Sequence, residues 1–104
     1  MENLEVINIA AYLKASKSLA FKSQVIEKYT SIFRFLSRNN LISINPFSEN
    51  GKVRDDLVVF KSDLTPIGFE LFKKAIPAWQ RSVDKSGNYD NVSSLEKALE
   101  KLKS

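Results

Sequence analysis

The feature that most constrains the fold is a broad apolar face that repeats at helical spacing across residues 18–39. Four apolar residues recur there at intervals of four, three and four: Val25, Tyr29, Ile32 and Leu36. This period is typical of one face of an amphipathic helix. Asn39 and Asn40 follow it, and asparagine tolerates the left-handed conformation that often ends a helix. We therefore predict a long helix over residues 18–39, and whether it is continuous or broken near Ser23 stays open.

Two shorter helices are predicted at the ends of the chain. Residues 3–17 carry apolar residues at helical spacing behind Asn3, which is a suitable N-cap. Residues 93–103 begin with Ser93 and Glu96 at the spacing of a capping box. Their apolar seam is narrow and consists of Leu95, Leu99 and Leu102. Because a helix this short is marginal alone, this seam must pack on the domain or on a second chain.

A further helical pattern begins at Thr65, which can cap it, and Pro66, which suits the first helical position. The pattern continues to Gly87, but Pro77 lies inside it. Proline removes one helix hydrogen bond, so we predict a kink or interruption near residues 73–76.

The segment between the predicted long helix and Thr65 reads as a β-hairpin over about residues 41–61. Residues 41–44 and 57–60 are apolar and rich in β-branched side chains, and a turn with Asn50 and Gly51 lies between them. The predicted fold class is therefore α+β and mostly helical, in the order α-α-β-β-α-α. Residues 1–104 have the length of a single domain.

Composition argues against enzymatic chemistry, because the chain contains no Cys and no His. It therefore lacks thiolate nucleophiles, the usual neutral-pH base and the usual zinc ligands. Asp55 and Asp56 are the most enzyme-like pair, yet adjacent strand residues point to opposite faces and Asp is common beside turns. The three glycines are too far apart for a phosphate loop. We predict a non-enzymatic protein with no metal and no cofactor.

Charge is mildly positive, with 16 basic and 12 acidic residues. The N-terminal residues include acids where a signal peptide carries bases, and no apolar run reaches 18 residues. We therefore expect a cytoplasmic protein without a membrane partner. Basic side chains gather on the first two predicted helices, and Arg34 and Arg38 share a face with Ser31 and Glu27. Such a face can contact phosphates and base edges, although a solvated face is the more common outcome.

Residues 36–79 resemble the second half of a winged-helix domain, particularly that of MarR-type regulators. The resemblance rests on the Leu-Thr-x-x-Gly step at residues 64–68, which follows the apolar run 57–60. This step leads into a segment, through Leu71 to Ile76, Pro77 and Trp79, that is similar to the long helix of the family. It implies that residues 24–38 form a recognition helix and that the hairpin is a wing. It also implies a homodimer built by the terminal helices.

This resemblance implies a set of contacts to double-stranded DNA. On the recognition helix they are Gln24, Lys28, Ser31, Arg34 and Arg38, and at the wing tip they are Lys52 and Arg54. Our first hypothesis is therefore DNA binding and transcriptional regulation.

The second hypothesis is a protein-binding module, such as an immunity or antitoxin-type protein that neutralises a partner. Aromatic residues make up 11% of the chain, and Phe35, Phe47 and Tyr89 are candidate anchors. Phe35 could instead make a second contact inside the domain. The continuity of residues 18–39 separates the hypotheses, because an unbroken helix has no helix-turn-helix and favours the protein partner.

Overall fold

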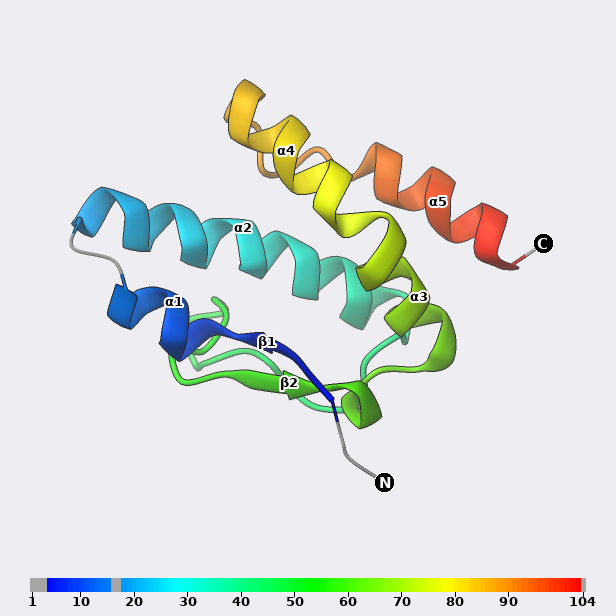
Figure 1. Ribbon diagram of the computed structural model, residues 1–104, viewed down its shortest axis with the longest axis horizontal. Helices are drawn as coiled ribbons and strands as arrows, with labels where there is room; N and C mark the ends of the chain where they lie inside the picture. Colours follow the sequence, from blue (N-terminus) through cyan, green and yellow to red (C-terminus); the bar gives the residue numbers. More distant parts are fainter. Residues whose placement is uncertain (1–3, 16–17, 104) are drawn as a thin grey trace.

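The computed structural model describes residues 4–15 and 18–103. The helices and strands follow one another in this order: β1 (Glu5–Asn8), α1 (Ile9–Ala15), α2 (Leu19–Arg38), β2 (Val58–Phe60), the 3-10 turn η1 (Lys61–Asp63), α3 (Pro66–Lys74), α4 (Ile76–Ser86) and α5 (Ser93–Lys103). In Figure 1, α2 runs across the molecule, with the two strands on one side of it and α4 and α5 on the other. The prediction of a mostly helical α+β fold is confirmed.

The long helix predicted over residues 18–39 is confirmed as α2, which has 20 residues and no break. Ser18 is its N-cap, and the Ser18 hydroxyl accepts a hydrogen bond from the Phe21 N–H. Beyond its end, Asn40 has a φ of 57°, in the left-handed region, and the Leu41 N–H donates to the Leu36 carbonyl. The asparagine pair therefore ends the helix in the expected way.

The helix predicted over residues 3–17 is wrong in its first half. Residues 5–8 form β1, and α1 begins at Ile9. Asn8 caps α1, because its Oδ1 accepts a hydrogen bond from the Ala11 N–H at 3.0 Å. Asn3, the expected cap, lies outside the described residues. Ile7 and Ile9 are both buried, so tertiary burial outweighs the helical pattern of this segment.

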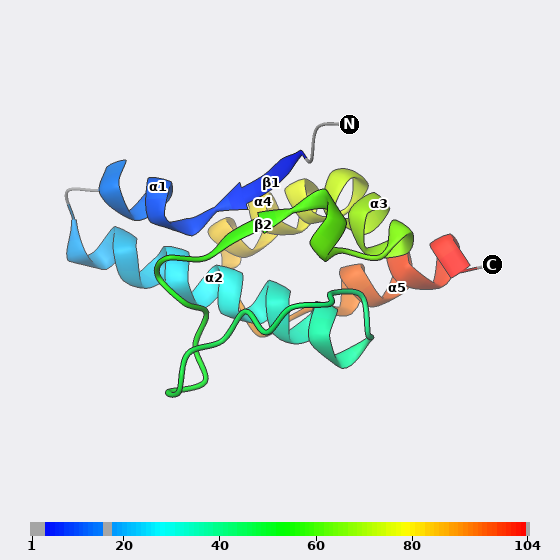
Figure 2. The ribbon, with the colours of Figure 1, turned by 90° about the horizontal axis from the view of Figure 1, so that it is seen from below.

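The two-stranded antiparallel sheet has different strands from those predicted. β2 pairs with β1, with Glu5 opposite Phe60 and Ile7 opposite Val59. Residues 41–44 do not pair with β2 as a hairpin, since Ile42 forms an isolated bridge with Leu64. A second isolated bridge, from Phe47 to Val53, closes the loop around Gly51. Figure 2 shows this loop projecting from the body of the molecule.

The predicted break near Pro77 is confirmed. Residues 66–74 form α3 and residues 76–86 form α4, with Ala75 between them. Thr65 caps α3 through its hydroxyl, which accepts from the Gly68 N–H at 3.0 Å. Gly87 ends α4 with a φ of 73°. Proline, threonine and glycine therefore set these boundaries locally.

The capping box predicted at the start of α5 is wrong, because Ser93 is the first residue of the helix and its hydroxyl donates to Asn91 Oδ1. α5 packs against α3 and α4. Leu95 and Leu99 are buried in the core, and Leu102 packs against it. The seam predicted for dimerisation is therefore covered by the chain's own helices.

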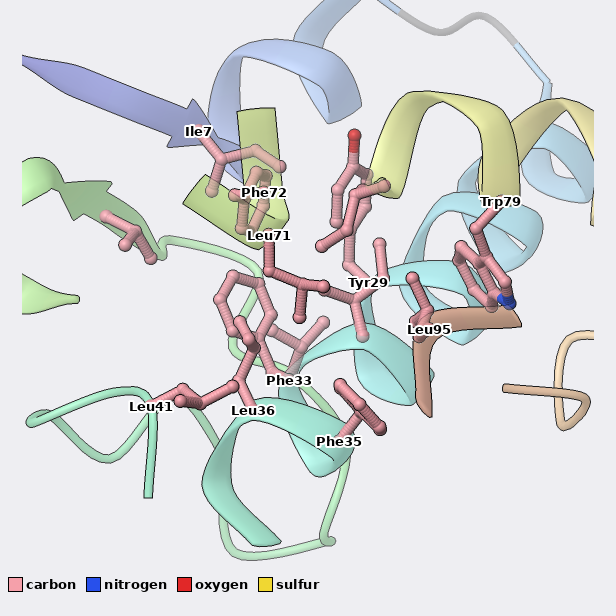
Figure 3. Close-up of a cluster of buried hydrophobic side chains, with 14 of the residues drawn as sticks. Ile7, Tyr29, Phe33, Phe35, Leu36, Leu41, Leu71, Phe72, Trp79 and Leu95 are labelled. Carbon is pink, nitrogen blue, oxygen red and sulfur yellow. The ribbon is translucent and has the colours of Figure 1, made fainter. Parts of the chain in front are cut away.

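The core gathers side chains from the sheet and from all of the longer helices. Figure 3 shows Tyr29, Phe33 and Leu36 of α2 in one cluster with Ile7, Phe72 and Leu95. The rings of Phe33 and Phe72 lie 6.2 Å apart, at a tilt. Trp79 is buried, and its Nε1 donates to the Asn91 carbonyl at 2.7 Å. Phe35 is also buried, so its prediction as a partner-facing aromatic is wrong and its contact is inside the domain.

Candidate functional site

A half-open pocket of about 230 Å³ lies where the outward face of α2 meets the loop after Asn45 and the turn after α4. α2 contributes Glu27, Thr30, Ser31 and Arg34, the loop contributes Lys52, and the turn contributes Tyr89 and Asp90. A second hollow lies on the other side of Lys52, and its lining includes Ile26, Arg54, Asp55 and Asp56. Because Lys52 borders both, we call these residues together the Lys52 surface.

Thr30 holds the loop against α2. Its hydroxyl is buried and accepts a hydrogen bond from the Val53 N–H at 3.0 Å. The neighbouring backbone also forms hydrogen bonds within the loop. The Ser48 N–H donates to the Lys52 carbonyl, and the Arg54 N–H donates to the Pro46 carbonyl. These bonds fix the backbone on both sides of Lys52, and they set its side chain beside α2.

Charges of both signs line the Lys52 surface. Arg34 and Lys52 share the pocket with the carboxylates of Glu27 and Asp90. Within residues 4–15 and 18–103, neither cation comes within 4.0 Å of a carboxylate oxygen. Their donors are therefore available to a partner, while the carboxylates offer acceptors in the same space.

Three of the residues predicted to bind nucleic acid meet in this pocket: Ser31, Arg34 and Lys52. Arg54 lies in the adjoining hollow. Glu27 belongs to the helix face that the sequence predicts around Arg34, whereas Thr30, Tyr89 and Asp90 are not among the predicted DNA contacts. Tyr89 was predicted as an aromatic anchor for a protein partner, and here it lies in the same pocket as Arg34.

The other predicted contacts lie elsewhere. Lys28 is directed to α4, where its Nζ lies 3.0 Å from an oxygen of Asp84. Arg38 is near α5, 3.9 Å from Glu96, and its guanidinium lies 5.9 Å from the centre of the Phe35 ring. Gln24 is exposed on α2 and lines neither hollow of the Lys52 surface. The basic side chains predicted on α2 therefore lie in three different places: Arg34 in the pocket, Lys28 against α4 and Arg38 near α5.

Tyr29 is the one titratable side chain of the described residues with a strongly altered pKa. Burial, together with the neighbouring Tyr12, raises the pKa of Tyr29 to about 12. Its ring stacks on Tyr12 with 5.9 Å between centroids, and its hydroxyl accepts from Gln80 Nε2 at 3.1 Å. A phenol that stays neutral and bonded in this way ties α1, α2 and α4 together and is poorly suited to proton transfer at neutral pH.

Across residues 4–15 and 18–103, no group of acidic side chains is arranged to hold a metal ion. No helix in the same ranges combines the length and the apolarity needed to cross a membrane. The sequence matches no protein-family model, and neither a curated protein nor a solved structure shows significant similarity to it.

Proposed function

We propose that this chain is a non-enzymatic protein-binding module that engages its partner through the Lys52 surface. The observation that carries the proposal is the pairing of Arg34 and Tyr89 in one half-open pocket. Arginine and tyrosine are the residue types most enriched among the dominant contacts of protein interfaces. Neutralising a toxic partner is one role that such a module can serve.

The charges of the Lys52 surface favour a protein over a nucleic acid. Two cations and two carboxylates line the pocket, and two cations and two carboxylates line the adjoining hollow. A phosphate backbone is bound by clustered positive charge, and nearby carboxylates oppose it. A protein segment can instead present charges of both signs in a matching pattern.

The continuity of α2 supports the same proposal. A helix-turn-helix places a separate recognition helix in the major groove after a short turn. Here residues 19–38 form one helix, and Lys28 pairs with Asp84 of α4 instead of facing outward. Of the side chains expected to contact the major groove or the phosphates, only Ser31, Arg34 and Lys52 lie together in the pocket.

The test is affinity capture with the full chain, followed by binding measurements on the captured protein. We expect one stoichiometric partner whose affinity falls at least about tenfold with Arg34→Glu or Tyr89→Ala, as for dominant interface contacts. Lys97→Glu is the matched control, because Lys97 is exposed on α5 and its substitution makes the same change in charge. Equal affinity of the wild type and of both Lys52-surface variants for every captured protein would rule out this surface.

Duplex DNA is the second candidate, because three of the seven contacts that the resemblance implies, Ser31, Arg34 and Lys52, lie together in one pocket. Fluorescence anisotropy with random duplex DNA at two salt concentrations tests it. If DNA is the ligand, binding is tighter at low salt and Arg34→Ala weakens it. The absence of binding below millimolar concentration at low salt eliminates this candidate and leaves the protein partner.

A further inference from the structure

Large apolar side chains are exposed where α1 and α2 meet, at one end of the molecule. Leu19 is 82% exposed, Phe21 is 48% exposed and Tyr12 is 45% exposed. This end lies at the far left of Figure 1, away from α5. Leu4, at 54%, is the one other exposed large apolar side chain in residues 4–15 and 18–103, and it precedes β1. We call Tyr12, Lys14, Leu19, Phe21 and Lys22 the tip.

Positive charge is concentrated in the same part of the sequence. Residues 6–26 contain Lys14, Lys17 and Lys22 and no acidic residue. The chain has 16 basic and 12 acidic residues, so the remainder carries 13 basic and 12 acidic residues. The segment that exposes the apolar side chains therefore carries +3 of the net charge of +4.

The lysines of the tip are available and lie beside its apolar groups. Neither Lys14 nor Lys22 forms an ion pair within the described ranges. Lys22 lines a hollow together with Leu13, Leu19 and Ile26, so charge and apolar surface adjoin directly. The lining of this hollow also includes Glu27, Lys52 and Asp55, which belong to the Lys52 surface. Such a surface complements a ligand whose outer layer is negatively charged and whose next layer is apolar.

We propose that the tip binds the surface of an anionic lipid bilayer. Leu19 and Phe21 enter the boundary between headgroups and acyl chains, and Lys14 and Lys22 contact the anionic headgroups. The excess of lysine favours this occupant over a protein, because lysine is depleted in protein interfaces. The sequence-based expectation of no membrane partner rested on the lack of a spanning segment, and a surface contact needs none.

The tip adjoins the Lys52 surface, since Lys52 also lines the hollow beside Lys22. The two proposals nevertheless depend on different side chains: lipid binding on those of the tip, and the proposed function on Arg34 and Tyr89. Each can therefore fail without the other. Binding to lipid also leaves the pocket side chains free to meet a protein partner.

Co-sedimentation of the full chain with lipid vesicles tests the proposal. One set of vesicles contains phosphatidylcholine alone, and the other contains about one-third phosphatidylglycerol, a proportion that gives a negative surface potential. We expect the chain to sediment with the anionic vesicles only, and to be released by added salt. Equal sedimentation with both sets, or none with the anionic set, would overturn the proposal.

Variants with matched controls distinguish binding through the tip from nonspecific association of the protein with lipid. The double variant Leu19→Ser/Phe21→Ser and the double variant Lys14→Glu/Lys22→Glu should each lower the partition coefficient by at least about tenfold. Leu4→Ser and the double variant Lys97→Glu/Lys103→Glu, which changes the net charge by the same amount as the tip variant, alter the same residue types elsewhere. Both should leave the partition coefficient within about twofold of the wild type. Circular dichroism checks that each variant is folded. If the controls lose as much binding as the folded tip variants, the tip is not the contact.

Discussion

The buried hydroxyl of Thr30 accepts a hydrogen bond from the N–H of Val53, 23 residues further along the chain, at 3.0 Å. This bond joins the middle of α2 to the loop that carries Lys52, which borders both hollows of the Lys52 surface. Together with the backbone hydrogen bonds of Ser48 and Arg54, this buried contact positions the exposed Lys52 beside α2.

We expect Thr30→Val to destabilise the protein by about 1–3 kcal/mol, because it leaves the Val53 N–H buried without an acceptor. Urea unfolding measures this change. Thr30→Ser keeps the hydroxyl and is the matched control, which should recover most of the loss. If valine and serine give equal stability, the hydrogen bond contributes little.

Leu95→Ala should lower the free energy of unfolding by about 2–5 kcal/mol, as for other large-to-small changes in a core. The reason is that Leu95 is fully buried against the chain's own helices. Because no second chain is needed to cover Leu95, the unfolding midpoint of this variant should not depend on protein concentration. A midpoint that rises with concentration would instead indicate that α5 packs on a second copy.

Gly68→Ala should destabilise the protein, although alanine is the better helix former by about 1 kcal/mol. A Cβ added at Gly68 would lie 2.6 Å from the backbone oxygen of Leu41, which also accepts a hydrogen bond from the Thr65 N–H. The backbone must therefore move, at a net cost of about 1–3 kcal/mol. Thermal unfolding measures it, and a gain in stability would show that the contact is easily relieved.

Stability should fall as the pH rises through the range in which Tyr29 titrates. The pKa of Tyr29 is raised by burial from 10.0 to about 12, so above pH 10 the unfolded chain loses this proton more readily than the folded chain. The contribution of the neutral Tyr29 hydroxyl to the free energy of unfolding is therefore fully present below pH 10 and is lost progressively towards pH 12. Urea unfolding at several pH values should show this slope.

Tyr29→Phe is the control for the pH dependence, because it keeps the ring and removes the ionisable group. The variant should be less stable at neutral pH by about 1 kcal/mol, since the Gln80 amide loses its acceptor. It should also lose most of the decline between pH 10 and 12. If the decline in stability between pH 10 and 12 is unchanged in this variant, other tyrosines and the lysines cause it.

Several helix boundaries depend only on neighbouring residues and can therefore be predicted from the amino-acid sequence. The cap at Thr65, the break before Pro77 and the stop at Gly87 act within one helical turn, so their residue types were sufficient to place them. The apolar period of residues 18–39 likewise predicted α2, because the period requires no knowledge of what covers the face.

Tertiary structure decided what each apolar segment packs against. β2 pairs with β1, whose paired residues lie 50 to 55 positions earlier in the sequence, and the nearer residues 41–44 do not take that place. Residues 5–8 carry apolar side chains at a spacing that also suits a helix, so local pattern predicts residues 41–44 as the partner of β2 instead. The seam of α5 is similar, because spacing shows that Leu95 and Leu99 must be buried and only packing shows that α3 and α4 bury them. The assembly of Arg34, Lys52 and Tyr89 follows from the same long-range contacts, which no local signal encodes.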